Sequence, residues 1–420
     1  MSKTFCMHPF TGLATREDGA IKVCCRSQPI AWIQETSIED AWNCDSMKEL
    51  RRKVMNDERP SECASCFMLE DQGVESLRQR HIKTEYPDSR TALFPNALDH
   101  LDTEDYSMSE PMSVIELKLN NLCNLKCRMC NPLDSTSWQD WDQVSEYYVR
   151  ENNFLVPTIQ KLVKKPGQYI GPFEDKEKWW DSFERIIPHL RRIEFAGGEP
   201  LMDPHHYKIL DMLKPYGKNI DLKYATNGTT LGITKGRTIH EYWPSFNSIV
   251  VNLSIDGIHD VYNHIRSNGD FTLIEKNIRE MKTIPNVKRI VGAFTTQAGN
   301  ALQIAACARY FIEELGIYFY SHRVSYPKVL SAQVLPRPLK ILAIENLMEL
   351  QDDIDTLKNI DNLPMAKEVL LQQIKDNINY LNGHDQSNLW KDYLEFNYRL
   401  DASRNSKSIL DVIPEFTQYS

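Results

Sequence analysis

The chain has 420 residues, of which 41% are hydrophobic and 25% charged, and its formal net charge is −9. This composition is typical of a soluble globular protein, and the length leaves room for two domains. No long basic block suggests duplex nucleic acid binding, and no apolar run reaches the ~18 residues that span a bilayer. The first residues lack the apolar core of a signal peptide, so we expect a cytoplasmic protein without membrane association.

Cysteine usage favours metal binding. Ten cysteines in a cytosolic chain of this length argue against a disulfide framework and for metal sites. Seven of them fall into two spaced sets, which are Cys6, Cys24, Cys63 and Cys66 near the N-terminus, and Cys123, Cys127 and Cys130 further along. Cys44 and Cys307 stand apart from both sets, and we interpret them as buried thiols without a metal role.

Residues 1–85 form a cysteine-rich region. The turn signal at Asp18-Gly19 precedes a strand-like stretch at 21–23, which runs into Cys24 and Cys25. Apolar spacing predicts a helix over residues 46–55, ended before Pro60. A C-x2-C pair at Cys63 and Cys66 then opens a second short helix. The next segment, residues 86–112, is polar and acidic with three prolines, so we expect a connection between domains.

From residue 113 to about 335, strand-like runs alternate with helical ones. The expected strands are 114–119, 192–196, 220–225, 248–255, 289–295 and 317–322, and the expected helices include 204–213 and 271–281. This alternation implies an α/β fold with a parallel sheet and right-handed crossovers. A helix-rich insertion at about 135–190 carries Trp138, Trp141, Trp179 and Trp180, which we interpret as packing residues.

Residues 336–420 are expected to form a helical C-terminal extension. Amphipathic stretches at 339–357 and 365–381 predict its helices. We expect this extension to cover the open side of the preceding sheet, and no chemistry is assigned to it.

The most informative stretch follows the first strand of the α/β region. Cys123, Cys127 and Cys130 are spaced C-x3-C-x2-C on a loop after that strand, where α/β folds place their chemistry. Three thiolates on one loop can hold three irons of a four-iron cluster and leave the fourth iron open to a ligand. A zinc loop that lacks its fourth ligand is the alternative from the residues alone. The spacing resembles the radical SAM superfamily, although Met129 replaces the family's usual aromatic residue.

Residues at the ends of later strands fit the same resemblance. Gly197-Gly198-Glu199-Pro200 resembles the GGEP motif, whose backbone and glutamate hold the amino group of S-adenosylmethionine. Asn227, Ser254 and Asp256 match positions that contact the ribose and its surroundings, and Arg266 matches the arginine that pairs with the methionine carboxylate. The residues alone leave other readings open: a surface turn for the glycines, ordinary turn chemistry for the next three, and a solvated helix residue for Arg266.

The N-terminal cysteines resemble another module of these enzymes. Twelve residues separate Cys6 from Gly19 and four separate Gly19 from Cys24, and a later C-x2-C pair follows at Cys63 and Cys66. This pattern resembles the truncated SPASM, or twitch, domain, which binds an auxiliary 4Fe–4S cluster, although here it precedes the core. Cys25 remains an alternative to Cys24 as a ligand. Four thiolates would also suit structural zinc.

Together these resemblances imply a partial (β/α)6 barrel of radical SAM type with an N-terminal cysteine-rich domain. The implied enzyme cleaves S-adenosylmethionine reductively at a 4Fe–4S cluster, and the resulting 5′-deoxyadenosyl radical abstracts hydrogen from a substrate. A flavodoxin or ferredoxin would supply the electron, and a peptide or protein is the expected substrate, as for a maturase. The alternatives are the same chemistry on a nucleotide or small molecule, and a non-catalytic metal-binding scaffold.

Overall fold

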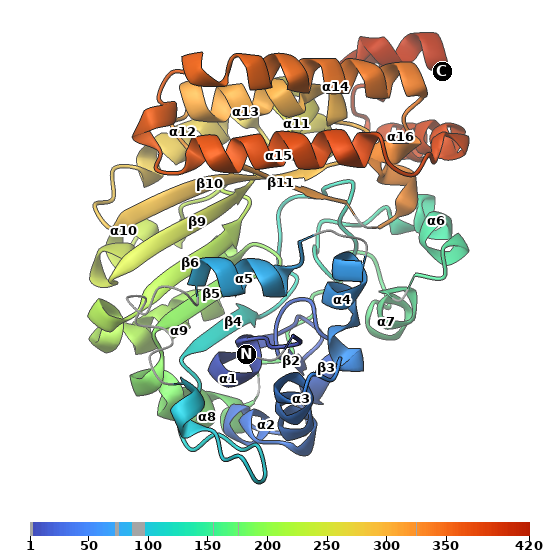
Figure 1. The fold of residues 1–420 in the computed structure, drawn as a ribbon. Helices are drawn as coiled ribbons and strands as arrows, with labels where there is room; N and C mark the ends of the chain where they lie inside the picture. The colour runs from blue at the N-terminus through green and yellow to red at the C-terminus, as the bar shows by residue number, and fades with distance from the viewer. Residues whose placement is uncertain (1–2, 72–74, 86–96, 154, 175, 325) are drawn as a thin grey trace. The chain divides into compact units, whose positions relative to one another are not determined.

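The computed structural model describes residues 3–71, 75–85, 97–153, 155–174, 176–324 and 326–420 (Figure 1). By its internal contacts the chain forms two compact units. The first comprises residues 1–121, 170–224 and 240–249, and the second comprises residues 122–169, 225–239 and 250–420. The predicted domain boundaries at 85, 112 and 335 stay predictions.

The first unit contains all of the cysteine-rich region. Its helices are α1 (His8–Thr11), α2 (Ile38–Trp42), α3 (Asp45–Met55), α4 (Ala64–Asp71), α5 (Leu77–Glu85), α8 (Glu177–Ile186), α9 (Pro204–Leu213) and most of α10 (Ile239–Tyr242). Its strands are β1 (Gly12–Thr15), β2 (Ala20–Lys22), β3 (Pro29–Trp32), β4 (Val114–Lys118), β5 (Arg192–Ala196) and most of β6 (Asp221–Thr226).

The sheet of the first unit explains how the cysteine-rich region is anchored. Its strands follow the order β6-β5-β4-β1-β2-β3. β4, β5 and β6 pair in parallel, and alternate side chains such as Ile115, Leu117 and Ile193 are completely buried. β1 pairs in parallel with β4, with Leu13 opposite Ile115, and β2 and β3 follow antiparallel. The N-terminal strands therefore extend the same sheet by backbone hydrogen bonds.

The second unit contains the loop of Cys123 and the C-terminal helices. Its strands are β7 (Gly232–Thr234), β8 (Arg237–Thr238), most of β9 (Ser248–Ser254), β10 (Val287–Thr296) and β11 (Tyr318–Arg323). Its helices are α6 (Ser145–Arg150), α7 (Leu155–Leu162), α11 (His259–Ile265), α12 (Phe271–Met281), α13 (Ile304–Glu313), α14 (Arg337–Asp352), α15 (Ala366–Leu381), α16 (Trp390–Arg404) and α17 (Ile409–Val412).

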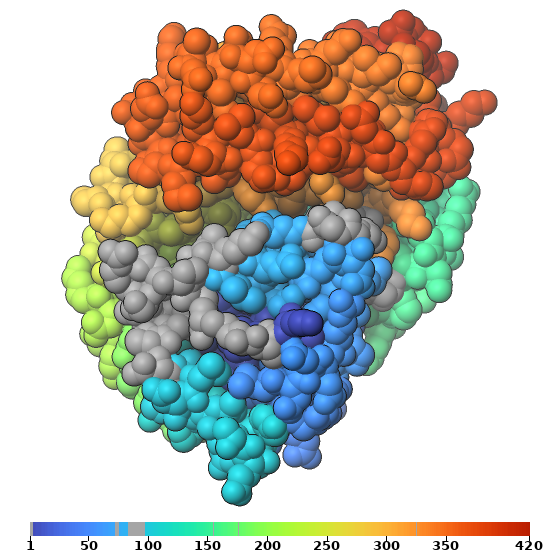
Figure 2. All heavy atoms as spheres, in the orientation of Figure 1, coloured from blue at the N-terminus to red at the C-terminus, as the bar shows by residue number. Residues whose placement is uncertain are grey.

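In this unit β9, β10 and β11 are neighbours in the order β11-β10-β9, and β10 and β11 pair in parallel from Val291 to Thr296. Ile249, Val251 and Leu253 alternate along β9 and are completely buried, as a sheet covered on that face requires. α14 and α15 lie side by side, and Figure 2 shows the surface that these helices present to solvent. Within the described residues, no helix is long and apolar enough to cross a membrane.

Most predicted elements are confirmed. The helices 204–213 and 271–281 have the predicted bounds, as does the strand 192–196, and β6 lies one residue later than expected. The prediction of a single helix over residues 339–357 is wrong at its C-terminal end, because α14 stops at Asp352. Asp352 and Asp353 place negative charge at the helix C-terminus, which opposes the helix dipole.

Two further predictions concern the connecting segment and the tryptophans. Residues 86–96 of the connecting segment lie outside the described residues, and 97–112 contain only a short 3₁₀ turn and an isolated bridge. Trp138 and Trp179 are buried as expected for packing residues, and Trp179 stacks on Phe183.

Candidate functional site

The three cysteines of the C-x3-C-x2-C stretch lie together. Cys123 and Cys127 are 9% and 4% exposed and form a buried cluster with Leu125, against which Met129 and Cys130 pack. The loop folds tightly because the amide of Cys130 donates to the carbonyl of Cys127 over 3.0 Å. The stretch predicted from spacing is therefore a compact group of three thiols, as one cluster with an open iron requires.

Polar side chains from two other segments reach these sulfurs. Nδ2 of Asn227 lies 3.6 Å from Sγ of Cys123, and Nη1 of Arg266 lies 3.5 Å from Sγ of Cys127. A hydrogen bond from Cys130 and the charge of Arg266 lower the pKa of Cys127. The same hydrogen bond raises the pKa of Cys130. Negative charge on the sulfur of Cys127 is thus stabilised by donors that the protein already holds in place, which suits a thiolate ligand.

Asn227 also ties the cysteine loop to the turn after β6. Its Nδ2 donates to Oδ1 of Asn124 over 3.0 Å, and its Oδ1 accepts from the amide of Thr229 over 2.9 Å. Nδ2 of Asn124 donates in turn to Oγ1 of Thr229 over 2.9 Å. The predicted ribose-side residue therefore contacts the cysteine loop itself, and its amide is engaged in holding that loop.

Arg266 and Asp256 form a buried ion pair. Nη2 of Arg266 lies 2.6 Å from Oδ2 of Asp256, which is completely buried, and the other oxygen of Asp256 accepts from the amide of Thr295 over 2.6 Å. Nε of Arg266 is buried and has no hydrogen-bond partner among the described residues. An orphaned guanidinium N–H beside the thiols is suited to an anionic ligand group. Ser254 ends β9 two residues earlier, with a half-buried side chain.

The Gly-Gly-Glu-Pro motif lies in the first unit, directly after β5. The amide of Gly198 donates to the carbonyl of Asn120 over 3.1 Å, and Asn120 precedes Cys123 by three residues. Glu199 is 1% exposed, and its Oε1 accepts from the amide of Leu201 over 3.0 Å. The motif thus forms a tight turn that is hydrogen-bonded to the chain leading into the cysteine loop.

The four N-terminal cysteines line one cavity in the first unit. Cys6, Cys24, Cys63 and Cys66 all face it, together with apolar residues such as Val54 and Phe67. Cys25 is exposed and does not line this cavity, which distinguishes it from Cys24. Burial raises the pKa of Cys6 and of Cys24, and raises that of Cys63 to about 12. Binding of a metal centre would draw the protons from these buried thiols, since cysteine ligates metals as the thiolate.

The arrangement of these thiols bears on the choice between iron–sulfur and zinc. Among the described residues, no group of three or more His, Cys, Asp or Glu side chains converges closely enough to hold a single metal ion. A zinc ion draws its sulfur ligands to ~2.3 Å from one centre. Four thiols that line one cavity are compatible with either kind of centre.

Sequence reasoning missed the residues that hold the cysteine loop. Nε1 of Trp138 donates to the carbonyl of Cys127 over 3.0 Å, and Oγ of Ser137 donates to that of Cys123 over 2.8 Å. Oγ of Ser135 donates to the carbonyl of Leu125 over 2.5 Å. The sequence signal for these contacts was the group of hydrogen-bond donors, Ser135, Ser137 and Trp138, soon after the last cysteine. Backbone carbonyls of a buried loop need such donors as partners.

Comparison with protein families agrees with this geometry. A model of the radical SAM superfamily matches residues 117–294, and a model of an iron–sulfur cluster-binding domain, SPASM, matches residues 6–67. Residues 117–294 therefore form a radical SAM domain, and residues 6–67 form an iron–sulfur cluster-binding domain. The two domains imply a 4Fe–4S cluster and S-adenosylmethionine as cofactors of the core, and an auxiliary iron–sulfur cluster in the SPASM domain. The partial barrel and the N-terminal placement of the SPASM domain are thereby confirmed.

Two solved structures are similar to parts of this chain. Native anSMEcpe with bound AdoMet is 18% identical, with 59% of this chain and 62% of that chain covered and a TM-score of 0.37. Streptococcus suis SuiB bound to precursor peptide SuiA is 14% identical, with 75% and 63% covered and a TM-score of 0.33. This chain therefore spans about three fifths of the length of these structures. No curated protein matches it.

Proposed function

We propose that this protein cleaves S-adenosylmethionine at a cluster held by Cys123, Cys127 and Cys130, and abstracts hydrogen from a peptide or protein. The observation that carries the proposal is the group of three packed thiols with Arg266 and Asn227 directed at two of the sulfurs. When bound, the cluster and S-adenosylmethionine supply the electron and the carbon-centred radical.

The residues of the chain then have distinct tasks. The cysteine loop leaves one iron for the ligand, and Arg266, with its unpartnered Nε, receives the methionine carboxylate. The turn at Gly197, Gly198 and Glu199 offers backbone and a carboxylate to the amino group. Asn227, Ser254 and Asp256 are assigned to the ribose side, with Asp256 also holding Arg266 in position.

Cys6, Cys24, Cys63 and Cys66 are proposed as the ligands of the auxiliary cluster. Their shared cavity supports this set and favours Cys24 over Cys25. The auxiliary cluster makes a peptide or protein the preferred substrate class, because relatives with this module commonly act on such substrates. An external flavodoxin or ferredoxin is proposed as the electron donor.

Anaerobic reconstitution tests the core proposal. The wild type should bind about eight irons and form 5′-deoxyadenosine when given a reductant and S-adenosylmethionine. Replacement of Cys123, Cys127 and Cys130 by Ala should abolish this product and leave about four irons. Loaded wild-type protein that forms no 5′-deoxyadenosine would contradict the enzymatic assignment.

A matched pair of variants tests the auxiliary site. Cys24→Ser should lose about four irons, whereas Cys25→Ser, the same change one residue later, should keep about eight. Equal loss in both variants would argue against the assigned ligand set. Zinc retained in place of iron at this site would support the structural alternative.

The substrate class is tested by isotope transfer. The enzyme is incubated with a fully deuterated lysate of its source that has been separated into protein and small-molecule fractions. Deuterium should enter 5′-deoxyadenosine from the protein fraction. Transfer from the small-molecule fraction alone would instead support a nucleotide or metabolite substrate.

A further inference from the structure

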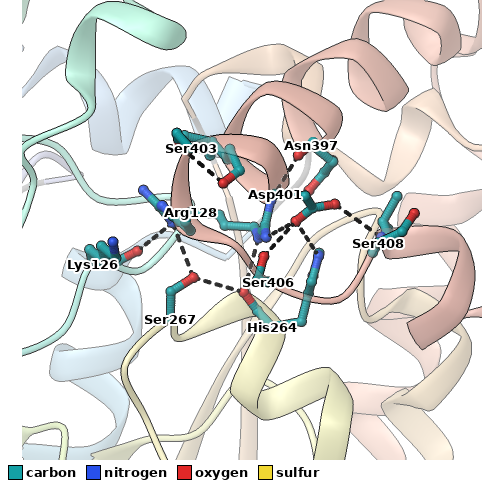
Figure 3. A network of polar contacts seen from close by, with 12 residues as sticks. Lys126, Arg128, His264, Ser267, Asn397, Asp401, Ser403, Ser406 and Ser408 are labelled. Carbon is teal, nitrogen blue, oxygen red and sulfur yellow. Dashed lines mark hydrogen bonds and ion pairs between the residues drawn. The ribbon is translucent and has the colours of Figure 1, made fainter.

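The residue directly after the second cysteine of the triplet is a deeply buried arginine. Arg128 is 1% exposed, and its Nε donates to the carbonyl of His264 over 2.9 Å. Its Nη1 donates to Oδ1 of Asn397 over 3.0 Å, and its Nη2 pairs with the carboxylate of Asp401 (Figure 3). A guanidinium this far from water requires a counter-charge, and α16 of the C-terminal extension supplies it.

Asp401 receives donors from three further groups. Its Oδ1 lies 2.9 Å from Nε2 of His264 and accepts from Oγ of Ser406 over 3.0 Å. Its Oδ2 accepts from the amide of Ile409 over 3.0 Å. Figure 3 shows His264 and Ser406 directed at the carboxylate of Asp401. Through these contacts Asp401 fixes the end of α16 to the end of α11 and to the start of α17.

A second arginine, Arg404 of α16, holds the cysteine loop on its other side. Nη1 of Arg404 donates to the carbonyl of Lys126 over 2.8 Å and to Oγ of Ser267 over 3.1 Å. Its guanidinium lies 4.6 Å from the ring centre of Trp138 and pairs with Asp140 over 2.7 Å. α16 thus contacts the cysteine loop at two places. Arg404 contacts Lys126, just before Cys127, and Asp401 contacts Arg128, between Cys127 and Cys130.

The cysteine loop is also hydrogen-bonded to the segment that carries Arg266. The amide of Lys126 donates to the carbonyl of Ser267 over 3.1 Å, and the amide of Arg128 donates to that of Ile265 over 2.9 Å. Arg266 lies between these two acceptors, and its Nη1 reaches Sγ of Cys127. The thiol loop and the arginine assigned to the cofactor carboxylate are therefore held in register by backbone hydrogen bonds. α16 contacts this paired region through Asp401, at His264, and through Arg404, at Ser267.

We propose that Asp401 is a positioning residue of the radical SAM site, acting through Arg128, and that the C-terminal extension is thereby part of the cofactor-binding machinery. This inference rests on the proposed function of the three cysteines. Neither Asp401 nor Arg128 is assigned a contact with the cluster or with S-adenosylmethionine. Their role is to hold Cys127, Cys130 and Arg266 at the spacing that the bound cofactor needs.

The decisive comparison uses the same substitution at two positions of α16. Asp401→Asn removes the buried charge, whereas Asp392→Asn changes an exposed side chain that lies 3.6 Å from Arg150. In reconstituted protein, Asp401→Asn should weaken S-adenosylmethionine binding about tenfold or more and diminish the cofactor-induced change in the EPR spectrum of the reduced cluster. Asp392→Asn should match the wild type, and Asp401→Glu should recover part of the response.

The outcomes separate this inference from the proposed function. A wild type without any EPR response to S-adenosylmethionine would refute the proposed function itself. A responsive wild type with an equally responsive Asp401→Asn variant refutes only the positioning role. Loss of about four irons from Asp401→Asn with the auxiliary cluster retained supports it, since the damage is then local to the cysteine loop.

If Asp401→Asn fails to fold, the double variant Arg128→Met with Asp401→Leu decides the question. Removing both charges avoids an unpaired buried ion, so this protein should fold. We expect it to bind S-adenosylmethionine about tenfold more weakly than the wild type. Wild-type binding and a wild-type EPR response in the double variant would overturn the proposal.

Discussion

A single methyl group at position 197 should uncouple the Gly-Gly-Glu-Pro turn from the chain leading into the cysteine loop. Gly197 has φ of +124°, where a residue with a side chain is strained by about 1–3 kcal/mol. A Cβ there would also lie 3.1 Å from the carbonyl oxygen of Asn120, the atom that accepts from Gly198. Gly197→Ala should therefore displace this carbonyl and, three residues later, Cys123.

Gly236 provides the matched control for that prediction. It has φ of +86°, but a Cβ at this position meets nothing within 4 Å. Gly236→Ala should thus carry the backbone strain without the close contact. Both variants should lower the free energy of unfolding by about 1–3 kcal/mol. Only Gly197→Ala should weaken S-adenosylmethionine binding, by about tenfold, as measured by titration calorimetry on reconstituted protein. Wild-type affinity in Gly197→Ala would refute the reasoning.

Three further predictions concern single side chains. Burial lowers the pKa of His206 to about 3, so the stability from its neutral form is complete above pH ~6.5 and is lost as the pH falls toward 3. When the pH is lowered from about 7.5 to 5, the free energy of unfolding of the wild type should fall by about 2 kcal/mol more than that of His206→Gln, as measured by thermal unfolding. An equal fall in both proteins would contradict the assigned burial. Arg51→Met should destabilise the N-terminal domain by about 3 kcal/mol or more, because Arg51 is completely buried and donates to the carbonyls of Pro9 and Trp42. Unchanged resistance of residues 3–71 to protease would refute this prediction. Asn227→Ala removes a donor to a proposed cluster sulfur and should lower the reduction potential in a redox titration, whereas an unchanged potential would show that the contact does not tune the cluster.

The elements of the barrel were predictable because each buries one face at a regular period. Ile115 and Leu117 alternate with half-buried Glu116 and Lys118 along β4, and this pattern is visible in the sequence. The cysteine triplet was predictable for a similar reason, since its spacing is local. What local patterns could not supply was the pairing of β1 with β4, which joins residues about a hundred positions apart.

The role of the C-terminal extension was beyond sequence reasoning for the same physical cause. Arg128 and Asp401 are separated by 273 positions, and no periodicity links them. The sequence did contain one clue: a charged residue lies inside a stretch whose neighbours, Cys127 and Met129, belong in a protein interior. A buried arginine demands a carboxylate somewhere in the fold, although only the folded chain identifies which one.

Arg266 and Asp256 illustrate how a correct choice of residues can still miss their relation. Sequence reasoning assigned them separate partners on the cofactor, yet in the structure they pair with each other over 2.6 Å. The two assignments are compatible, because Nη2 faces Asp256, Nη1 faces Cys127, and Nε is unpartnered among the described residues. A completely buried Asp256 held by the amide of Thr295 keeps the guanidinium oriented before any ligand arrives. An arginine held ready in this way loses less freedom when a carboxylate binds, which favours both affinity and a fixed cofactor orientation.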